Sequence, residues 1–244
     1  MDEKFQLEAA RIVTGLPSYA SRYALYFETG WGTLKSRREK RKLNLMYEIQ
    51  HNIAPDYLRE LVPPLVRENN DYNLRNNENI NIPPCRLNIY RKSFVPSTIS
   101  LWNNLPIDVR NSTNINQFKK RLDEHDNEPS SRPSYFSYGN RKTNVIHTRL
   151  RHRCSQLHSD LHRINLVSDP SCRCGFPNEN AIHFFLECNL YSNYRLDLFR
   201  KIRETTASPS IDVILYGDSD KPYDDNIKMF RAVHNFISQT KRFD

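Results

Sequence analysis

Three cysteines and one histidine lie close together in the carboxy-terminal half of the chain, in the segment CRCGFPNENAIHFFLEC. Cys172, Cys174, His183 and Cys188 follow the spacing C-x-C-x8-H-x4-C. Thiolates and imidazole are the ligands that Zn²⁺ takes in its tetrahedral structural sites. Because protein side chains would fill all four positions, no open site would remain for an activated water. The pattern therefore predicts a structural zinc knuckle rather than a catalytic metal.

The same four residues could also be buried thiols beside a core histidine, and the spacing leaves that alternative open. Only one residue separates the first two cysteines, which is tighter than zinc sites usually have. His183 and Cys188 lie five positions apart, and an ideal α-helix would separate them by about 140° around its axis. If both residues bind one ion, the helix must begin late or distort between them.

Two other residues of the segment are expected to support the knuckle. Gly175 directly follows the second cysteine, and glycine permits the positive φ that a metal-binding turn requires. Glu179 lies one helical turn before His183 and would accept a hydrogen bond from the second imidazole nitrogen. Outside the segment, Cys154 is predicted to be a core residue, and Cys85 is assigned no role.

Amphipathic periodicity predicts the helices that would position the knuckle. Apolar residues at steps of three and four predict one helix of about 20 residues from Ile146 to Ile164. Three histidines around this helix have no cysteine at matching spacing and are expected at the surface: His147, His158 and His162. An apolar-rich helix is expected through FFLECNLYSNYRLDLFRKI, and a last helix from about Asp224 to Lys241.

The triplet Tyr223-Asp224-Asp225 is similar to the paired aspartates of a polymerase hairpin. Those carboxylates must lie in a tight turn between apolar strands to hold two metal ions. Here the triplet follows a proline and precedes a helical pattern, so Asp224 or Asp225 is interpreted as an N-cap or first-turn acid. We find no other clustered carboxylates, and the chain is expected not to be an enzyme.

The rest of the chain is also expected to be helical. Helices with Pro-punctuated connections are predicted over residues 5–13, about 33–51, 55–62 and 115–125. An Asn-rich irregular loop is predicted at 68–84. The sequence thus indicates a mainly α-helical fold with three parts: a helical region at 1–125, a linker at 126–140 and a zinc-knuckle domain at 141–244.

Composition agrees with a helical protein outside the secreted classes. The 244 residues include 6 Gly against 14 Pro, and so few glycines disfavour a strand-rich sandwich with glycine turns. Five cysteines, an odd number with three of them clustered, argue against a secreted disulfide framework. The first residues lack the apolar stretch of a signal peptide, and no apolar run has the length of a membrane span. The chain is therefore expected to be intracellular, nuclear or cytoplasmic.

The formal charge of +8, from 36 Lys and Arg against 28 Asp and Glu, suits a polyanionic partner. A merely soluble basic protein could carry the same net charge, so the clustering of charges must decide. Two basic blocks are predicted to contact phosphates: Lys35, Arg37, Arg38, Lys40, Arg41 and Lys42 in the first, and Arg141, Lys142, Arg149, Arg151 and Arg153 in the second. Aromatic residues near the knuckle could stack on bases, but Phe184 and Phe185 are expected in the core.

Several stretches resemble the carboxy-terminal region of invertebrate non-LTR (LINE-type) retrotransposon polyproteins, downstream of the reverse transcriptase palm. They are LEAARIVTGLP, ALYFETGW, LKSRREKRKLNLMYEIQ, FVPSTISLWNNLP, HTRLRHRCSQLHSDLHRINLV and the knuckle with its context. In that family a C-x1–3-C-x7–8-H-x4-C motif near the carboxy terminus is associated with nucleic-acid binding during target-primed reverse transcription. The resemblance places the four ligands at the cysteines and histidine named above, and it implies that residues 1–125 form a thumb-like or linker region.

These observations predict a nucleic-acid-binding segment of a retrotransposon-derived reverse transcriptase protein, non-catalytic by itself. Its expected partners are RNA or single-stranded DNA, and a reverse transcriptase domain in a longer parent protein. The alternative is a protein-interaction scaffold in which zinc only staples the carboxy-terminal helices, with no intrinsic nucleic-acid role. The chain contains neither catalytic aspartates nor an endonuclease segment, so no independent polymerase activity follows from the resemblance.

Overall fold

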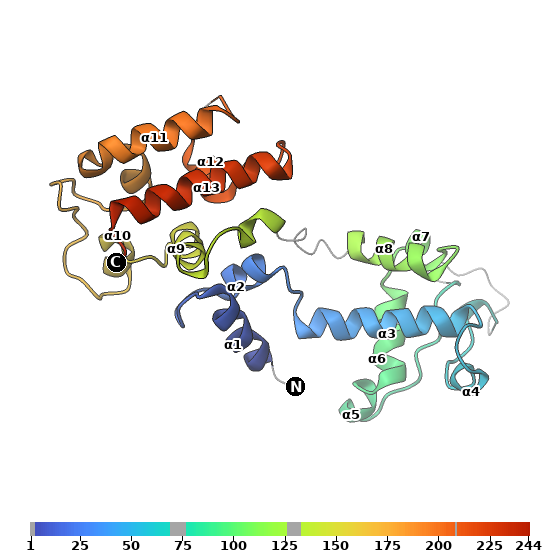
Figure 1. Ribbon diagram of the computed structural model, residues 1–244. Coiled ribbons are helices and arrows are strands. Elements are labelled where there is room, and N and C mark those ends of the chain that lie inside the picture. The colour runs from blue at the N-terminus through green and yellow to red at the C-terminus, as the bar shows by residue number, and fades with distance from the viewer. Residues whose placement is uncertain (1–2, 69–76, 126–132, 208) are drawn as a thin grey trace. The chain divides into compact units, whose positions relative to one another are not determined.

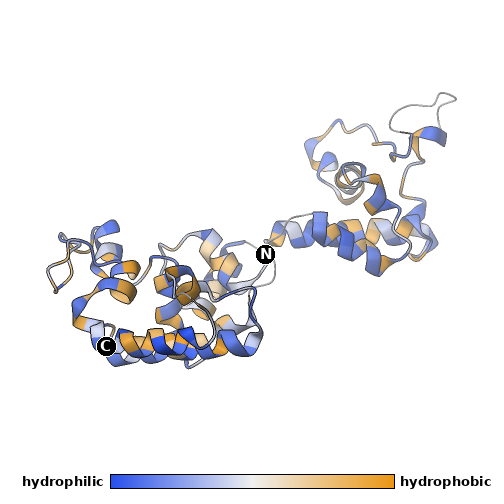
Figure 2. Ribbon diagram, turned by 90° about the horizontal axis from the view of Figure 1, so that it is seen from above, coloured by the Kyte–Doolittle hydropathy of each residue, from blue (hydrophilic) through white to orange (hydrophobic). Residues whose placement is uncertain are grey.

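The computed structural model describes residues 3–68, 77–125, 133–207 and 209–244 (Figure 1). Over these ranges the chain is mainly helical and has no β-strand, so the predicted fold class is confirmed. The helices mix apolar and polar residues along their length, as helices that bury one face do (Figure 2). The chain divides into a knuckle unit, Met1–Trp31 with Ser131–Asp244, and an inserted unit, Gly32–Ser130.

The amino-terminal helices belong to the knuckle unit, whereas the sequence placed them in one region with all residues up to 125. α1 (Glu3–Thr14) and α2 (Arg22–Thr29) pack against each other. Leu7 of α1 and Leu25 of α2 share a buried cluster with Cys154, which is therefore a core residue as expected. Periodicity shows that a helix buries one face but not which distant segment covers it, and this explains the misplaced boundary.

The predicted linker at 126–140 is only partly described. Residues 126–132 lie outside the described ranges. Residues 133–140 are not a linker, because Ser134–Ser137 form the short 3₁₀ helix η2 and Phe136 within it is buried. The Phe136 ring stacks on Phe230 with 5.8 Å between centroids. Phe136, an aromatic residue in a Ser- and Pro-rich stretch, thus anchors that stretch to the unit.

The inserted unit is built around α3 (Leu34–Gln50), where a helix was predicted. Thr33 begins this helix, because its hydroxyl accepts a hydrogen bond from the Ser36 amide. Five more α-helices follow among the described residues of the unit: α4 (Asp56–Arg59), α5 (Asn88–Arg91), α6 (Phe94–Asn103), α7 (Ile107–Arg110) and α8 (Ile115–His125), with the 3₁₀ turn η1 (Val66–Glu68) between α4 and α5. α3 packs on α6 and α8 around a core that includes Met46, Trp102 and Phe118.

Two details of the inserted unit refine the predictions. The helix predicted over 55–62 has only one turn, α4, and Asn114 caps α8 as its side chain accepts from the Gln117 amide. Of the loop predicted at 68–84, residues 69–76 lie outside the described ranges. The remainder is irregular but fixed, since Ile80 is buried and both its backbone groups bond to the Asn103 side chain.

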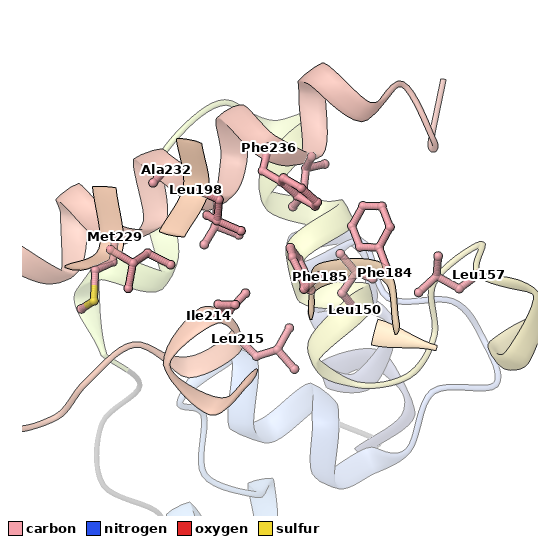
Figure 3. Close-up of a cluster of buried hydrophobic side chains, with 13 residues drawn as sticks. Leu150, Leu157, Phe184, Phe185, Leu198, Ile214, Leu215, Met229, Ala232 and Phe236 are labelled. Atoms are coloured by element: carbon pink, nitrogen blue, oxygen red, sulfur yellow. The ribbon is translucent and has the colours of Figure 1, made fainter. Parts of the chain in front are cut away.

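The carboxy-terminal part of the knuckle unit contains α9 (Arg141–Arg151), α10 (His158–Arg163), η3 (His183–Glu187), η4 (Asn189–Tyr191), α11 (Ser192–Arg203), α12 (Ile211–Tyr216) and α13 (Tyr223–Thr240). α11 lies along α13 (Figure 1). Phe184, Phe185, Leu198 and Phe236 meet in the core between them, which confirms the core prediction for the two phenylalanines (Figure 3). α13 begins one residue before the predicted start, and Asp224 and Asp225 lie in its first turn, as expected.

The single helix predicted from Ile146 to Ile164 is wrong, since α9 and α10 are separate helices. Arg153 has a φ of +55°, which an α-helix cannot accommodate. Beyond it, Ser155 donates from both its amide and its hydroxyl to the buried Asp160 carboxylate. The apolar spacing continues across the break because Leu150 and Leu157 pack into the same core.

A buried ion pair joins α2 to α9. The Arg151 guanidinium lies 2.7 Å from the Glu28 carboxylate, and the two side chains are 0% and 1% exposed. Arg151 also donates to the Leu215 carbonyl at 2.9 Å and lies 3.9 Å from the centroid of the Phe136 ring. His152 approaches the same Glu28 oxygen at 2.9 Å. These contacts hold the amino-terminal helices against the carboxy-terminal part of the unit.

Two histidines form a buried hydrogen-bonded chain in the knuckle unit. His147 was expected at the surface but is 1% exposed, because α13 and α12 cover its face of α9. One His147 nitrogen lies 3.0 Å from the Ile214 carbonyl and the other lies 3.2 Å from His234. Burial, with the nearby Arg151 charge, lowers the pKa of His147 well below its ordinary value and that of His234 to about 4.

This pair is expected to make the knuckle unit acid-labile. Between pH 6.5 and about 4 the unfolded state binds protons that the folded His234 does not, so the free energy of unfolding falls as the pH falls through this window. Urea titrations at pH 7 and pH 4 measure how much unfolding free energy each protein loses on acidification. We expect His234→Gln to lose up to about 3 kcal/mol less than wild type. The exposed His162→Gln is the control and should keep the wild-type pH dependence. An equal loss of unfolding free energy between pH 7 and pH 4 in all three proteins would contradict the assignment of this loss to His234.

Candidate metal centre

A tight turn positions the first two cysteines of the cluster. The Cys172 amide donates to the Phe176 carbonyl at 2.8 Å, and the Gly175 amide donates to the Cys172 carbonyl at 2.9 Å. Gly175 has a φ of +90°, which confirms the expected need for glycine at this position. The turn compensates for the short spacing between the two cysteines, because it folds both side chains to the same side.

A π-helical turn positions the histidine and the third cysteine. His183–Glu187 form η3, and the Cys188 amide donates to the His183 carbonyl at 2.8 Å. This i→i+5 bond closes one wide turn, so residues five apart come to lie nearly above one another. It is the distortion that the spacing required, and π-turns of this kind occur frequently at functional sites.

The four predicted ligands converge. Their ligand atoms all lie within 4.8 Å of one another, with Cys172, His183 and Cys188 buried and Cys174 half-buried. The sulfurs of Cys172 and Cys188 are 3.8 Å apart, and the Cys174 sulfur lies 3.2 Å from Nε2 of His183. All three cysteines are free thiols rather than disulfide partners. This cluster could hold a metal ion.

The surroundings shift the pKa values of the three thiols in different directions. Burial raises the pKa of Cys188, and it raises the pKa of Cys172 to about 12. The backbone amide of Phe176 holds the pKa of Cys174 below its ordinary value. Cys172 and Cys188 therefore hold their protons more firmly than an ordinary cysteine does, and binding of a divalent metal would have to release these protons.

Glu179 has a different role from the one predicted. Its carboxylate does not contact His183 but accepts a bidentate pair from Arg242, at 2.8 and 2.6 Å, and a hydrogen bond from the His158 amide at 2.9 Å. The same carboxylate lies 3.9 Å from the Cys172 sulfur. Glu179 thus links the knuckle to α10 and to the end of the chain beyond α13.

Other groups fix the imidazole. The Phe176 ring stacks on His183 with 4.2 Å between centroids and an interplanar angle of 6°. Nε2 faces the cysteines, whereas the buried Nδ1 has no hydrogen-bond partner and lies 3.6 Å from the Glu187 carboxylate. A metal bound at Nε2 would keep the proton on Nδ1, and the carboxylate nearest to that proton is Glu187 rather than Glu179.

Two arginines that sequence reasoning missed complete the surroundings of the cluster. Arg195 of α11 donates to the carbonyl of Phe185, inside the π-turn, at 2.8 Å and to the carbonyl of Cys188, directly after it, at 2.6 Å. Arg242 holds Glu179 from 63 positions away. Spacing gives no signal for such a distant partner.

The structure rejects one predicted phosphate contact. Arg151 is buried in the ion pair with Glu28, so no phosphate can reach it. Arg153 of the same block is exposed. The block's other members surround a pocket on the knuckle unit: Arg141, Lys142 and Arg149.

The basic residues of α3 are better exposed. Lys35, Arg37, Arg38 and Arg41 are exposed, whereas Lys40 and Lys42 are half-buried and bind the side chains of Asp123 and Ser97. Arg38, Arg41 and Lys42 line a groove of about 670 Å³ with Lys119 of α8, opposed by Glu48 alone among the lining residues in the described ranges. Phe94, 38% exposed, lies in the same groove. Lys119 and Phe94 are thus candidate contacts that the sequence did not indicate.

Among the described residues, every helix is too short or too polar to cross a lipid bilayer.

Comparison with known proteins gives no match to any protein-family model, curated protein or solved structure. The resemblance to retrotransposon proteins therefore remains a prediction from the stretches quoted above.

Proposed function

We propose that this chain is a nucleic-acid-binding segment of a retrotransposon-derived reverse transcriptase protein, non-catalytic by itself, whose knuckle unit is held together by structural zinc. The convergence of four cations in one groove of the inserted unit is the observation that carries the binding function. The convergence of three thiols and an imidazole is the observation that supports a zinc ion at this site.

Zinc fits the cluster by ligand type and by distance. In a tetrahedron with Zn–S bonds of about 2.3 Å, two sulfurs lie about 3.8 Å apart, the separation found between Cys172 and Cys188. Soft thiolates disfavour Mg²⁺ and Ca²⁺, which take oxygen ligands. With four protein ligands the ion would be saturated, so its role is to fix the π-turn and the cysteine turn relative to each other.

The groove of the inserted unit suits a polyanion. Net charge alone does not distinguish a nucleic-acid-binding protein from a soluble basic one, but clustered charges do. α3 and α8 together present Arg38, Arg41, Lys42 and Lys119 along one hollow, beside the exposed ring of Phe94. Cations along a groove with an aromatic side chain are the arrangement that binds a single strand through phosphates and base stacking.

Neutralising the groove is expected to weaken binding and to flatten its salt dependence. Each phosphate contact on a single strand contributes about 0.7 to the slope of log K against log salt, so Arg38→Gln, Arg41→Gln and Lys119→Gln together should reduce that slope by about 2. Fluorescence anisotropy with a labelled single-stranded oligonucleotide, between 50 and 300 mM KCl, measures both affinity and slope.

The matched control neutralises three exposed cations of the knuckle unit that were not predicted to contact phosphate: Arg200, Arg203 and Lys228. This variant should keep the wild-type slope. Wild-type protein that fails to bind at low salt would remove the proposed function, and a groove variant with unchanged binding would remove the groove from it.

A specific observation also favours the second candidate, a zinc-stapled protein-interaction scaffold. α1 exposes Phe5, Ile12 and Val13 at 68%, 70% and 52%. Their spacing places them on one face of the helix, which could receive an apolar partner. This candidate predicts the same zinc-dependent fold with no affinity for nucleic acid, so the anisotropy experiment separates the two.

A further inference from the structure

A pocket of about 440 Å³ lies in the knuckle unit, along α9 and beside the end of the chain. Its volume is in the range of pockets that hold small ligands. Val145 and Ile146 of α9 form one apolar wall, and Phe243 belongs to the lining as well. Neither the metal centre nor the groove of the inserted unit involves these residues.

Three cations line the same pocket, and no acidic residue does in the described part of the chain: Arg141, Lys142 and Arg149. Arg141 and Arg149 are oriented by the carbonyls of Ile12 and Gly15, at 2.6 and 2.9 Å. A carbonyl leaves the guanidinium charge uncompensated, so both arginines keep their attraction for an anion. Lys142 already holds a carboxylate, that of Asp244 at 2.7 Å, in an exposed pair that an incoming phosphate could displace.

The wall at the end of the chain is fixed rather than loose. The Phe243 ring packs edge-on against Phe184 with 5.4 Å between centroids. Arg242, next to it, is held by Glu179 and donates to the Gln156 carbonyl at 3.0 Å. Gln156 also lines the pocket, and its side-chain amide can both donate to and accept from the edge of a base.

We propose that this pocket holds one unpaired nucleotide of a single-stranded polynucleotide, with the base against Val145 and Phe243 and the phosphates at Arg141, Lys142 and Arg149. The proposal rests on the proposed function and adds a site for the base. A duplex does not fit, because its bases are stacked and paired, whereas proteins that read single strands place splayed bases on aromatic and arginine side chains. The combination of an apolar wall, a cationic lining and one amide matches a nucleotide better than it matches a simple polyanion.

The test compares a labelled single-stranded DNA 12-mer with an abasic 12-mer of the same charge and with the 12-mer in duplex form. We expect the single strand to bind at least about fivefold more tightly than the abasic strand. Gln156→Trp, which places a bulky side chain at an exposed position of the pocket lining, should reduce this difference without weakening the abasic strand, and the remaining difference is the one expected from stacking on Phe94 in the groove. Phe243→Leu, which keeps the bulk and removes the aromatic face, should reduce the difference.

Asn193→Trp is the matched control, because it places the same side chain on an exposed position of α11 that does not line the pocket. It should behave as wild type, and thermal melts establish that each variant is folded. Equal binding of the base-containing and abasic strands, or of the single strand and the duplex, would overturn the pocket proposal and leave the proposed function intact. Absence of binding to all three would overturn both.

Discussion

Removing the metal is expected to unfold most of the carboxy-terminal part of the knuckle unit. Structural zinc sites contribute on the order of 10 kcal/mol, which is comparable with the whole stability of a typical domain. Phe184 and Phe185 lie between His183 and Cys188 in sequence, so two of the four ligands and the centre of the core belong to the same π-turn. Cys172→Ser should therefore lose the bound zinc and melt at the temperature of chelator-treated wild type, with no further change when chelator is added.

Cys154→Ser is the matched control for this substitution. Cys154 is 6% exposed and Cys172 is 4% exposed, so both variants place a hydroxyl in a buried position, but Cys154 belongs to the cluster with α1 and α2. It should keep the zinc and lose only the small amount of stability expected of a buried Cys-to-Ser change. Melting curves followed by circular dichroism, with zinc content for each protein, measure the effect. A wild-type melting temperature that chelator does not alter would contradict the metal's structural role.

Breaking the buried ion pair is expected to cost about 3–5 kcal/mol of unfolding free energy. Arg151→Met leaves the Glu28 carboxylate without its buried guanidinium partner, and Glu28→Gln leaves the Arg151 charge uncompensated. Each single variant leaves one charged side chain, 0% or 1% exposed, without its oppositely charged partner, where solvent cannot screen it. Urea titration of the two single variants and of the double variant measures the coupling.

The double variant should be less destabilised than the sum of the singles, because it removes both charges together. The half-buried surface pair Lys201–Asp197, at 2.7 Å, is the control and should couple by less than about 1 kcal/mol. Additive effects at Arg151 and Glu28 would show that the two charges do not compensate each other.

Local patterns predicted the elements well where neighbours in sequence are also neighbours in space. α3, α8 and α13 lie close to their predicted bounds because caps and apolar spacing are local signals. The break between α9 and α10 was missed, since the apolar steps continue through it while Arg153 adopts a positive φ. Hydrophobic spacing reports which face is buried, not whether the backbone between two buried residues stays helical.

In the candidate site, too, local features could be predicted and contacts between distant segments could not. The four ligands and the need for a distorted helix could be predicted from spacing, and the π-turn at His183–Glu187 meets that need. The contact between Glu179 and Arg242 could not be predicted, because it depends on how the end of α13 packs over the knuckle. Burial of Arg151 was likewise invisible in a run of basic residues, since its partner Glu28 lies 123 positions away.

We propose that Cys172, Cys174, His183 and Cys188 bind one zinc ion together, and the structural role of the knuckle depends on this binding. X-ray absorption at the zinc edge of the purified chain tests it most directly, because it reports the number and type of ligand atoms. We predict three sulfur ligands at about 2.3 Å and one nitrogen at about 2.0 Å, with no oxygen. A protein without stoichiometric zinc, or a spectrum dominated by oxygen ligands, would contradict the account.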